Sequence, residues 1–437
     1  MIFPPPVKAV KQRPSISTPI TFTATILQLA SSLVISRSLS TGALLIFSYF
    51  VGPEPFAPFG VFIAIVTILW VGIFGCYEQA LFVCRDEEIA PLARLCCAVA
   101  TLVLVAVSLI CVGITMVRPG FVDTMQGLPL VVIAIPFALA ARALHRLVCN
   151  LATRAGHFSL LVRSNWMQAA VQGSVLLALL AGGLPAIACL VAADVIGLAA
   201  VTALMLWRLP TFRSMMLARL PRSKLMSCAC SWVAMPSWRL AMSLTSVTAL
   251  SLPALTIPLF FPAALAGQIV FAMRMLELPS NVVTGAVTPI LQNHLSSEKR
   301  SRSFAVRAVI TLTALTVVTF GIIAMLVALL TPVFQGGRWA MSAESVAPLT
   351  IYFIGLTISA PFVGSVIGVA IERGAAASQL IFLSLTASAV VLMAAGLPLF
   401  WVLEAFGMAC LVRALVSGAM YIRQHPRQGT ESNVGYR

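Results

Sequence analysis

The sequence predicts an all-α polytopic membrane protein with about twelve transmembrane helices, and three observations lead to this prediction. Of the 437 residues, 60% are hydrophobic and 9% are charged, and the mean hydropathy is +1.02. A soluble protein of this length needs a more charged surface. Apolar runs of about 20 residues recur along the chain, and each is long enough to cross a hydrocarbon core of about 30 Å. The runs are continuously apolar rather than alternating, which favours helices over a β-barrel.

The expected spans form two groups of six on either side of a basic connector. The first group covers residues 30–50, 58–81, 92–115, 128–147, 160–180 and 185–206. The second group covers residues 240–260, 263–291, 304–330, 346–370, 377–397 and 400–421. Residues 22–36 are also apolar and stop at Arg37. They form either a helix lying on the membrane surface or the true start of the first span.

This grouping divides the chain into two bundles and three cytoplasmic segments. The expected divisions are an N-terminal segment (1–29), an N-terminal six-helix bundle (30–206), a basic connector (207–239), a C-terminal six-helix bundle (240–421) and a tail (422–437). Because each group holds an even number of spans, both bundles start from the same side of the membrane. That arrangement predicts a parallel repeat about a pseudo-two-fold axis along the membrane normal. A loose echo between FVGPEPFAPFGVF (50–62) and FFPAALAGQIVF (260–271) agrees with it.

Lys and Arg are distributed unequally between the two sides of the membrane. With the N-terminus placed in the cytoplasm, the outer loops hold Arg118 and Arg338, and the apolar runs hold Arg37, Arg274 and Arg413. The other basic residues lie on the inner side, as the positive-inside rule requires. We therefore expect both termini in the cytoplasm and contact between the basic loops and anionic lipids.

The composition also argues against several other kinds of protein. The net charge of +15 does not indicate nucleic-acid binding, because a basic balance is the usual result of orientation in a polytopic protein. The ten cysteines lie mostly within apolar runs and form no Cys-x-x-Cys, and the four histidines complete no zinc spacing. No inner loop carries a Walker A motif. We expect no metal, no cofactor and no nucleic-acid partner.

Three stretches carry a resemblance to a known family. GPEPFAPFG (52–60) resembles a Gly-Pro-Glu turn, lengthened here by the residues from Pro55 to Pro58. GCYEQALFV (75–83) resembles the segment that ends the second helix in members of that family. MRMLELPSNVVTGAVTPIL (273–291) resembles the eighth helix of its members. The family they resemble is that of the polysaccharide flippases, within the multidrug/oligosaccharidyl-lipid/polysaccharide exporter superfamily.

The resemblance implies a fold and an activity. The fold is two six-helix bundles around a central cavity, which alternate access by rocking. The activity is translocation of a lipid-diphosphate-linked oligosaccharide from the inner to the outer leaflet of the bacterial inner membrane. The product would serve exopolysaccharide, capsule or lipopolysaccharide O-antigen synthesis. The implied partners are the polyprenyl diphosphate carrier with its glycan and a polysaccharide polymerase complex.

Charged residues within the apolar runs are the candidate site residues. A charge at the bilayer centre costs at least about 2.5–3.5 kcal/mol on insertion scales, so such residues mark pathways. Arg274 and Glu277 are three positions apart and share a helix face, with Pro279 behind them. Arginine suits a diphosphate because its planar fork makes bidentate, charge-assisted bonds. We expect Arg37 and Arg274, on the first and eighth spans, to bind the diphosphate from opposite bundles.

Other polar residues have secondary roles in this prediction. Arg142 and Arg146 lie one turn apart near the inner end of the fourth span, where they flank the membrane or line the inner mouth. Gln268 and Asn281 are candidates for hydrogen bonds to sugar hydroxyls. Glu277 and Asp194 are candidate ion-coupling residues, with H+ or Na+ as the coupling ion.

Structural alternatives stand beside these roles. Arg274 and Glu277 can form a self-neutralising structural pair. Arg37 and Arg413 can extend toward the inner headgroups. Asp194 can hydrogen-bond a neighbouring helix without touching cargo.

Two other functions remain as alternatives. A multidrug and toxin extrusion-type exporter needs a neutral or acidic cavity, and arginines in the path would repel its cationic cargo. A membrane polysaccharide polymerase or ligase needs a large outer loop with catalytic residues. The longest outer loops, 116–128 and 331–346, hold four charged residues: Arg118, Asp123, Arg338 and Glu344. We therefore expect a transporter and not an enzyme.

Overall fold

The computed structural model describes residues 19–82, 84–117, 128–217, 220–233, 235–296, 302–334, 337–365 and 369–423. The expected N-terminal segment up to residue 18 and the expected tail from residue 424 lie outside the described residues. Within the described part, helices of 17 residues or more number six before the connector and six after it. All-helical architecture is therefore confirmed.

The bounds of these helices follow the predicted order of spans. The first six are α1 (Pro19–Phe50), α2 (Phe56–Gly72), α4 (Ile89–Val117), α6 (Leu128–Arg154), α7 (Phe158–Ala181) and α8 (Ala186–Arg208). The second six are α11 (Leu240–Phe260), α12 (Ala263–Ser296), α13 (Arg302–Phe334), α14 (Ala340–Ser365), α15 (Val369–Ala394) and α16 (Leu399–Arg423). Among the described residues, eight helices are long and apolar enough to cross a membrane by length and composition, and α12, which carries Arg274 and Glu277, is not among them.

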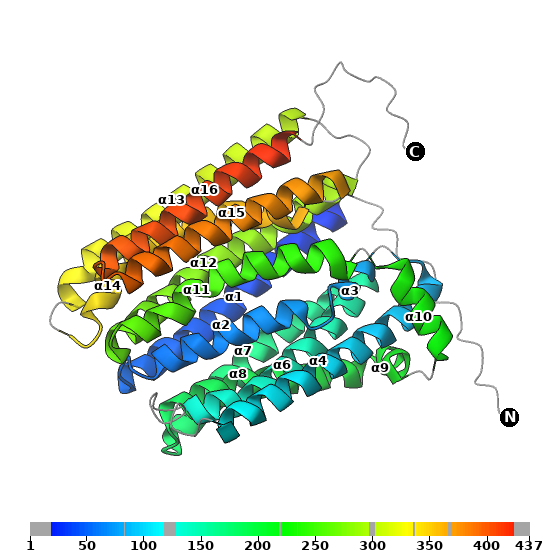
Figure 1. Ribbon diagram of the computed structural model, residues 1–437, viewed down its shortest axis with the longest axis horizontal. Helices are drawn as coiled ribbons and strands as arrows, with labels where there is room; N and C mark the ends of the chain where they lie inside the picture. Colours follow the sequence, from blue (N-terminus) through cyan, green and yellow to red (C-terminus); the bar gives the residue numbers. More distant parts are fainter. Residues whose placement is uncertain are drawn as a thin grey trace.

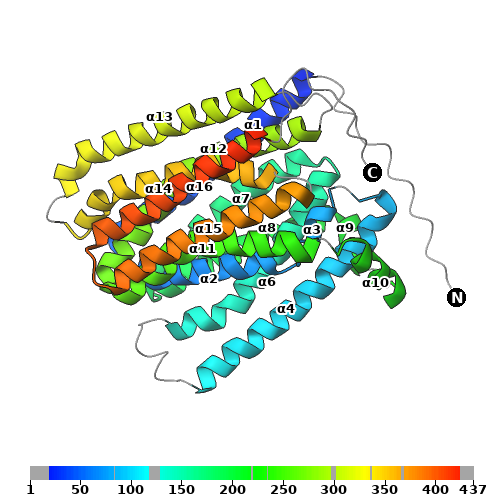
Figure 2. The same ribbon diagram turned by 45° about the horizontal axis from the view of Figure 1, so that its top comes forward.

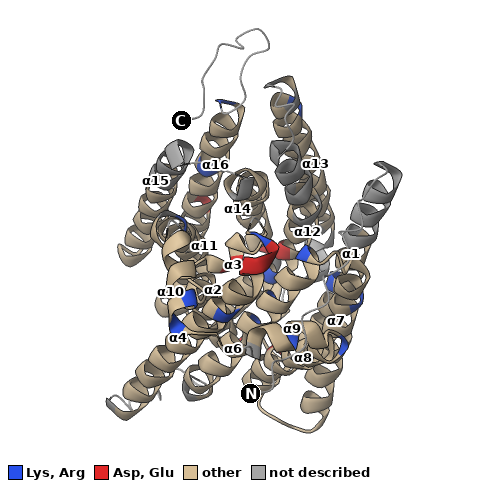
Figure 3. Cartoon of the chain, turned by 90° about the vertical axis from the view of Figure 1, so that its right-hand side faces the viewer, with Lys and Arg blue, Asp and Glu red and all other residues tan. Residues whose placement is uncertain are grey.

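Short helices gather at one end of the molecule, which we call the connector end (Figure 1). They are α3 (Tyr77–Ala80), the 3₁₀ turn Asp86–Glu88, α9 (Pro210–Leu217), α10 (Arg222–Ser231) and the π-helical turn Met235–Arg239. Figure 3 looks onto this end and shows Lys and Arg on α9, α10, α4 and α7 around acidic residues near α3. The first turn of α1 and the last turn of α16 lie at the same end. We call the other end the opposite end.

The long helices form two bundles, each with its own core. The first core is built largely from α2, α4, α6 and α8, around fully buried side chains such as Phe62 and Leu139. The second core joins α11 to α16 around Phe320, Phe353 and Phe406. The bundles meet where α1 contacts α12 and where α2 contacts α11 and α12. Figures 1 and 2 both show α2 beside α11 along this contact.

The last hairpin of each bundle repeats the same turn. AGGLP (181–185) joins α7 to α8, and AAGLP (394–398) joins α15 to α16. Gly183 (φ +75°) and Gly396 (φ +82°) take the left-handed conformation. The amide of the following leucine donates to the carbonyl five residues earlier, at 3.2 Å in both turns. This is a Schellman C-cap, which needs glycine at that position. The repeat supports a parallel relation between the bundles.

Several helix bounds differ from the expected ones, among them the start of α15 at Val369 rather than near residue 377. α1 begins at Pro19, because proline suits the first helical position and neither proline nor glycine follows until Gly42. α2 ends at Gly72 rather than near residue 81, because Gly75 and Cys76 have positive φ angles of 58° and 63°. α6 continues to Arg154 and so passes the expected end by seven residues.

Candidate functional site

Five charged side chains lie at similar depths between the two bundles, and we call them the central charge cluster: Arg37, Arg142, Asp194, Arg274 and Glu277. At a rise of 1.5 Å per residue, Arg37, Arg142 and Arg274 lie about 20, 21 and 17 Å from the opposite end of their helices, and Asp194 about 12 Å. A hydrocarbon core is about 30 Å thick, so these depths are near its middle.

Arg274 and Glu277 form an ion pair within α12. Arg274 Nη1 lies 2.6 Å from Glu277 Oε2, and the two side chains are 24% and 41% exposed. The pair faces the first bundle, because the charges of Arg37 on α1 and Arg142 on α6 also act on the Glu277 carboxylate. Asn281 is half-buried and lies one turn farther along the same face. The structure thus brings Arg274, Glu277 and Asn281 to the surface between the bundles.

Arg142 pairs with Asp194 across two helices of the first bundle. Arg142 Nη2 lies 2.8 Å from Asp194 Oδ2, and the side chains are 20% and 14% exposed. The expectation that Arg142 lies near the inner end of its span is wrong. It lies in the middle of α6, because that helix is longer than predicted at its inner end. Asp194 therefore has a basic partner that its sequence neighbourhood did not reveal.

Arg146 is held apart from the cluster by its own partners. Its Nη2 lies 2.6 Å from Glu78 Oε1, and its guanidinium lies 4.6 Å from the centroid of the Trp70 ring. The Glu78 side chain is 1% exposed. Burial raises the pKa of the Glu78 carboxyl, and the Arg146 guanidinium opposes that effect. Arg146 thus stabilises a buried carboxylate beside α3 rather than standing open to a ligand.

Arg37 is the most exposed cation of the cluster. It lies on α1, whose neighbours include α12, and its charge reaches Glu277. Among the residues described, no ion pair holds its guanidinium. Gln268 is half-buried on α12. It lies three residues before Phe271 and is therefore nearer the opposite end than Arg274. It is thus closer to the aromatic contact between Phe56, Phe271 and Trp339 than to the cluster.

The bundles are sealed together at the opposite end by aromatic rings. The aromatic seal consists of Phe56 on α2, Phe271 on α12 and Trp339 before α14. Its ring centroids are 5.3 Å apart for Phe56–Phe271, 5.7 Å for Phe56–Trp339 and 4.6 Å for Phe271–Trp339. A Cβ at Gly267 would overlap the carbonyl oxygen of Pro53, so the backbones touch there.

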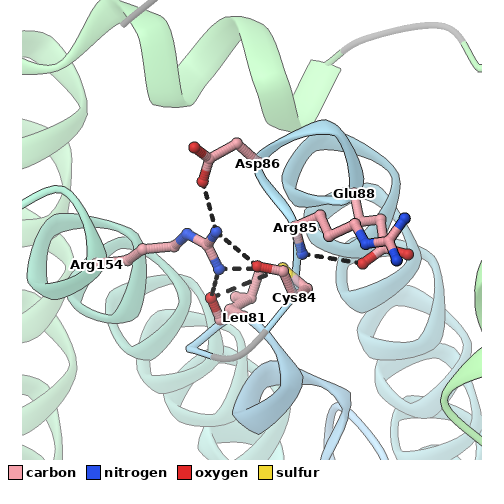
Figure 4. Close-up of polar contacts among 6 residues, drawn as sticks. All are labelled: Leu81, Cys84, Arg85, Asp86, Glu88 and Arg154. Atoms are coloured by element: carbon pink, nitrogen blue, oxygen red, sulfur yellow. Dashed lines mark hydrogen bonds and ion pairs between the residues drawn. The ribbon is translucent and has the colours of Figure 1, made fainter. Parts of the chain in front are cut away.

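Hydrogen bonds from Arg154 fix the turn between α2 and α4 at the connector end (Figure 4). Arg154, in the last turn of α6, donates Nη2–H to the Cys84 carbonyl at 2.8 Å and to Asp86 Oδ1 at 2.7 Å. Its Nη1 donates to the Leu81 carbonyl. Nearby, Arg239 before α11 donates to Gln79 Oε1 at 2.5 Å and so links the second bundle to α3.

Arg413 is a buried cation whose setting the sequence did not reveal. It lies in the middle of α16 and is 4% exposed, so the alternative that it extends toward the headgroups is wrong. Nη2 donates to Ser246 Oγ at 2.7 Å, and the guanidinium lies 4.8 Å from the Phe382 ring centroid. Within the described residues it makes no ion pair. The sequence feature that indicates this buried setting is an arginine deep in an apolar run with no acidic residue one helical turn away.

The central charge cluster has the chemistry of an anion site. Three guanidinium groups face two carboxylates, so the cluster carries one net positive charge. Arginine keeps its charge in any protein environment and recognises phosphate oxygens through paired N–H donors. Over the described part of the chain, no group of three or more His, Cys, Asp or Glu side chains could hold a metal ion.

Comparison with known proteins gives matches by structure and not by sequence. No protein-family profile and no curated protein matches the sequence. The eukaryotic MATE transporter AtDTX14 matches with a TM-score of 0.63 at 12% identity, over 93% of this chain and 98% of that one. A multidrug resistance MATE transporter of the MOP superfamily, in an inward-facing conformation, has a TM-score of 0.63 at 13% identity, over 92% and 98% of the chains. The lipid II flippase MurJ, in an inward closed conformation, has a TM-score of 0.61 at 12% identity, over 90% and 86%.

These neighbours are named as transporters and a flippase. At 12–13% identity the likeness establishes the fold and leaves the cargo open. The chain therefore has the two-bundle membrane fold that MATE transporters share with the flippase MurJ.

Proposed function

We propose that the protein is a flippase that moves a lipid-diphosphate-linked oligosaccharide from the inner to the outer leaflet of the bacterial inner membrane. The cargo enters the space between the bundles with its diphosphate on the central charge cluster, while its lipid tail stays in the bilayer. Rocking of the bundles then alternates access to the two leaflets. The transported glycan serves exopolysaccharide, capsule or O-antigen synthesis.

The observation that carries this proposal is the net positive charge of the cluster at mid-membrane depth. Its cations come from both bundles, since Arg37 and Arg142 belong to the first and Arg274 to the second. An unbalanced charge at this depth is costly, so an anionic cargo gives it a purpose. The neighbour MurJ is named as a flippase of lipid II, which supports a lipid-linked cargo within this fold.

Multidrug export is the second candidate, because two of the compared neighbours are MATE transporters. An organic cation would meet three arginines at the centre of the path. Like charges in a low-dielectric space repel by several kcal/mol. The charge balance of the cluster thus favours the anionic cargo over a cationic drug.

The remaining parts of the proposal follow from this role. The connector end faces the cytoplasm, because its surface is basic. Anionic lipids contact that surface, and a polysaccharide polymerase receives the cargo on the other side. Glu277 or Asp194 carries H+ or Na+ if transport is coupled. Asn281 lies on the cluster face of α12 and hydrogen-bonds the sugar nearest the diphosphate.

A translocation assay tests the proposal directly. Proteoliposomes holding a lipid-diphosphate oligosaccharide are assayed with wild type, Arg274→Ala and Arg37→Ala at matched protein levels. Arg208→Ala is the control, because Arg208 is exposed at the connector end beside Trp207. We expect both cluster variants to lose at least about 90% of transport, since losing one charge-assisted contact costs about 1.5–3 kcal/mol, and the control to keep it. Full transport in both cluster variants would refute the assignment.

The same preparations separate the two candidate functions. Uptake of an organic cation such as ethidium by wild type, with no lipid translocation, would establish multidrug export instead. Coupling is read from the effect of collapsing the proton gradient or removing Na+. If neither treatment slows transport, Glu277 and Asp194 are not coupling residues.

A further inference from the structure

Glu277 has an unusual setting for an acidic residue in a membrane helix. Three cations act on its carboxylate, namely Arg274, Arg37 and Arg142, and they come from three helices of both bundles. Its side chain is nevertheless 41% exposed. The carboxylate is thus partly exposed among positive charges from three helices. A phosphate group bound to these arginines would compete with it for the same donors.

The two carboxylates of the cluster are held in different ways. Asp194 is 14% exposed and joins α8 to α6, 52 residues away in sequence, so it helps to fix the bundle. Glu277 pairs three residues back along its own helix, and among the described residues no ion pair joins it to a second element. Pairs of this kind stabilise an isolated helix by only about 0.2–0.5 kcal/mol. Glu277 can therefore leave Arg274 without breaking an ion pair between two helices.

We propose that Glu277 is a tethered counter-anion that occupies the phosphate position when the cavity is empty and is displaced by the cargo's diphosphate. This inference rests on the proposed function. With Glu277 in place the five-residue cluster carries a charge of +1, and with Glu277 moved away the other four residues carry +2. A diphosphate that joins a lipid to a sugar carries two ionised groups, so displacement matches the charge of the site to the charge of the cargo.

The tether has two consequences for transport. A ligand has to compete with Glu277 for Arg274, which selects for strongly anionic, bidentate groups. After release, Glu277 returns to Arg274 and lowers the charge of the empty cavity. An empty transporter with a less charged centre reorients more easily through the low-dielectric membrane.

An equilibrium binding experiment tests the tether. Purified full-length wild type, Glu277→Gln, Arg274→Gln and the control Glu404→Gln are titrated in nanodiscs with farnesyl diphosphate, with uncharged farnesol as the matched ligand. Glu404 lies on α16 outside the cluster. We expect Glu277→Gln to bind farnesyl diphosphate about tenfold more tightly, which corresponds to about 1.4 kcal/mol. Arg274→Gln should bind it at least tenfold more weakly. Farnesol affinity should be unchanged in every variant.

A second measurement tests whether the return of Glu277 to Arg274 after cargo release speeds the next transport cycle. In proteoliposomes, later turnovers of Glu277→Gln should be slower than its own first turnover, whereas wild type should keep one rate. If Glu277→Gln binds the diphosphate no more tightly while Arg274→Gln loses binding, the tether is wrong and the flippase site stands. If neither variant changes diphosphate binding, the site and the proposed function fail together.

Discussion

Helices α6 and α8 of the first bundle correspond to α14 and α16 of the second, but the two pairs are held together by different contacts. The first pair is bridged by the ion pair Arg142–Asp194. The second pair meets through glycines, since a Cβ at Gly355 would overlap the backbone of Cys410, and one at Gly407 would lie 3.1 Å from Ile351. Asp194 and Gly407 both lie nine residues after the proline of the shared turn. At equivalent positions, one bundle has a charge and the other has a glycine packed against Ile351.

The same contrast extends to the other polar contacts. The first bundle also holds the ion pairs Arg146–Glu78 and Arg154–Asp86. The second bundle has hydroxyl bonds in the equivalent role, such as Thr357 to Ser280 at 2.8 Å and Tyr352 to the Leu250 carbonyl at 2.8 Å. Among the described residues, ion pairs thus join elements of the first bundle where hydroxyl bonds join helices of the second. The second is a tightly packed support whose α12 supplies Arg274 and Glu277.

The largest expected effect is on the ion pairs of the first bundle. Arg146→Ala leaves the Glu78 carboxylate buried without its partner, so we expect a loss of about 3–5 kcal/mol in the free energy of unfolding. The measurement is unfolding in mixed SDS micelles followed by tryptophan fluorescence. Arg85→Ala, at an exposed residue whose side chain makes no ion pair among the residues described, is the control and should change little.

The pH dependence of the Arg146→Ala loss checks its cause. Burial raises the pKa of Glu78, and without Arg146 that pKa rises further. A carboxyl whose pKa is raised on folding keeps its stability below its unfolded value, near 4.5, and loses it as the pH rises through the folded value. The loss should therefore be small at pH 4 and grow toward pH 8. A loss that does not vary with pH would point to the Trp70 contact instead.

Close packing in the second bundle gives the next largest effect. Gly355→Ala places a methyl group against the backbone of Cys410, which cannot move aside as a side chain can. Overpacking of this kind costs about 1–3 kcal/mol, and we expect a value near the upper limit. Gly321→Ala on α13 is the control, because a Cβ there meets nothing within 4 Å. Equal stability of the two variants would show that α14 and α16 are less tightly packed than described.

Arg413 tests whether the second bundle needs a charge in its core. Replacing a buried ionic group by an apolar side chain of similar size is often neutral or stabilising by about 1–4 kcal/mol. We expect Arg413→Met to gain about 1 kcal/mol, because the guanidinium lacks a carboxylate partner in the described part of the chain. The Arg413→Lys variant should have a lower free energy of unfolding than Arg413→Met. A clear loss of stability in Arg413→Met would mean that the bonds to Ser246 and Phe382 outweigh the cost of burying the charge.

The shared turns give the smallest effect and test the repeat itself. Gly183→Ala and Gly396→Ala each force a Cβ into the left-handed region, at about 1 kcal/mol. Because the two turns have the same hydrogen bonds, the two losses should agree within about 0.5 kcal/mol. The measurement is the same unfolding assay, with the double variant to check additivity. A large difference would show that the turns are not equivalent.

The sequence was sufficient to predict the helices and the pairing of Arg274 with Glu277, because both depend on residues close together in the chain. The repeat of AGGLP and AAGLP was also visible and was missed. The pairs Arg142–Asp194 and Arg146–Glu78 join residues 52 and 68 positions apart, so only the packed bundle shows them. The same holds for Arg413 and Ser246, which are 167 positions apart. The aromatic seal required knowledge of which helices of the two bundles touch.

The spacing of the two central ion pairs has a consequence for biosynthesis. Arg274 and Glu277 are three residues apart, so α12 can enter the translocon with its charges already neutralised by its own helical turn. Arg142 has to wait for Asp194, which is synthesised 52 residues later. α6 must therefore remain next to the insertion machinery, or in contact with water, until α8 arrives. The first bundle is thus expected to enter the lipid as a group of helices, whereas the charges of α12 need no partner from another helix.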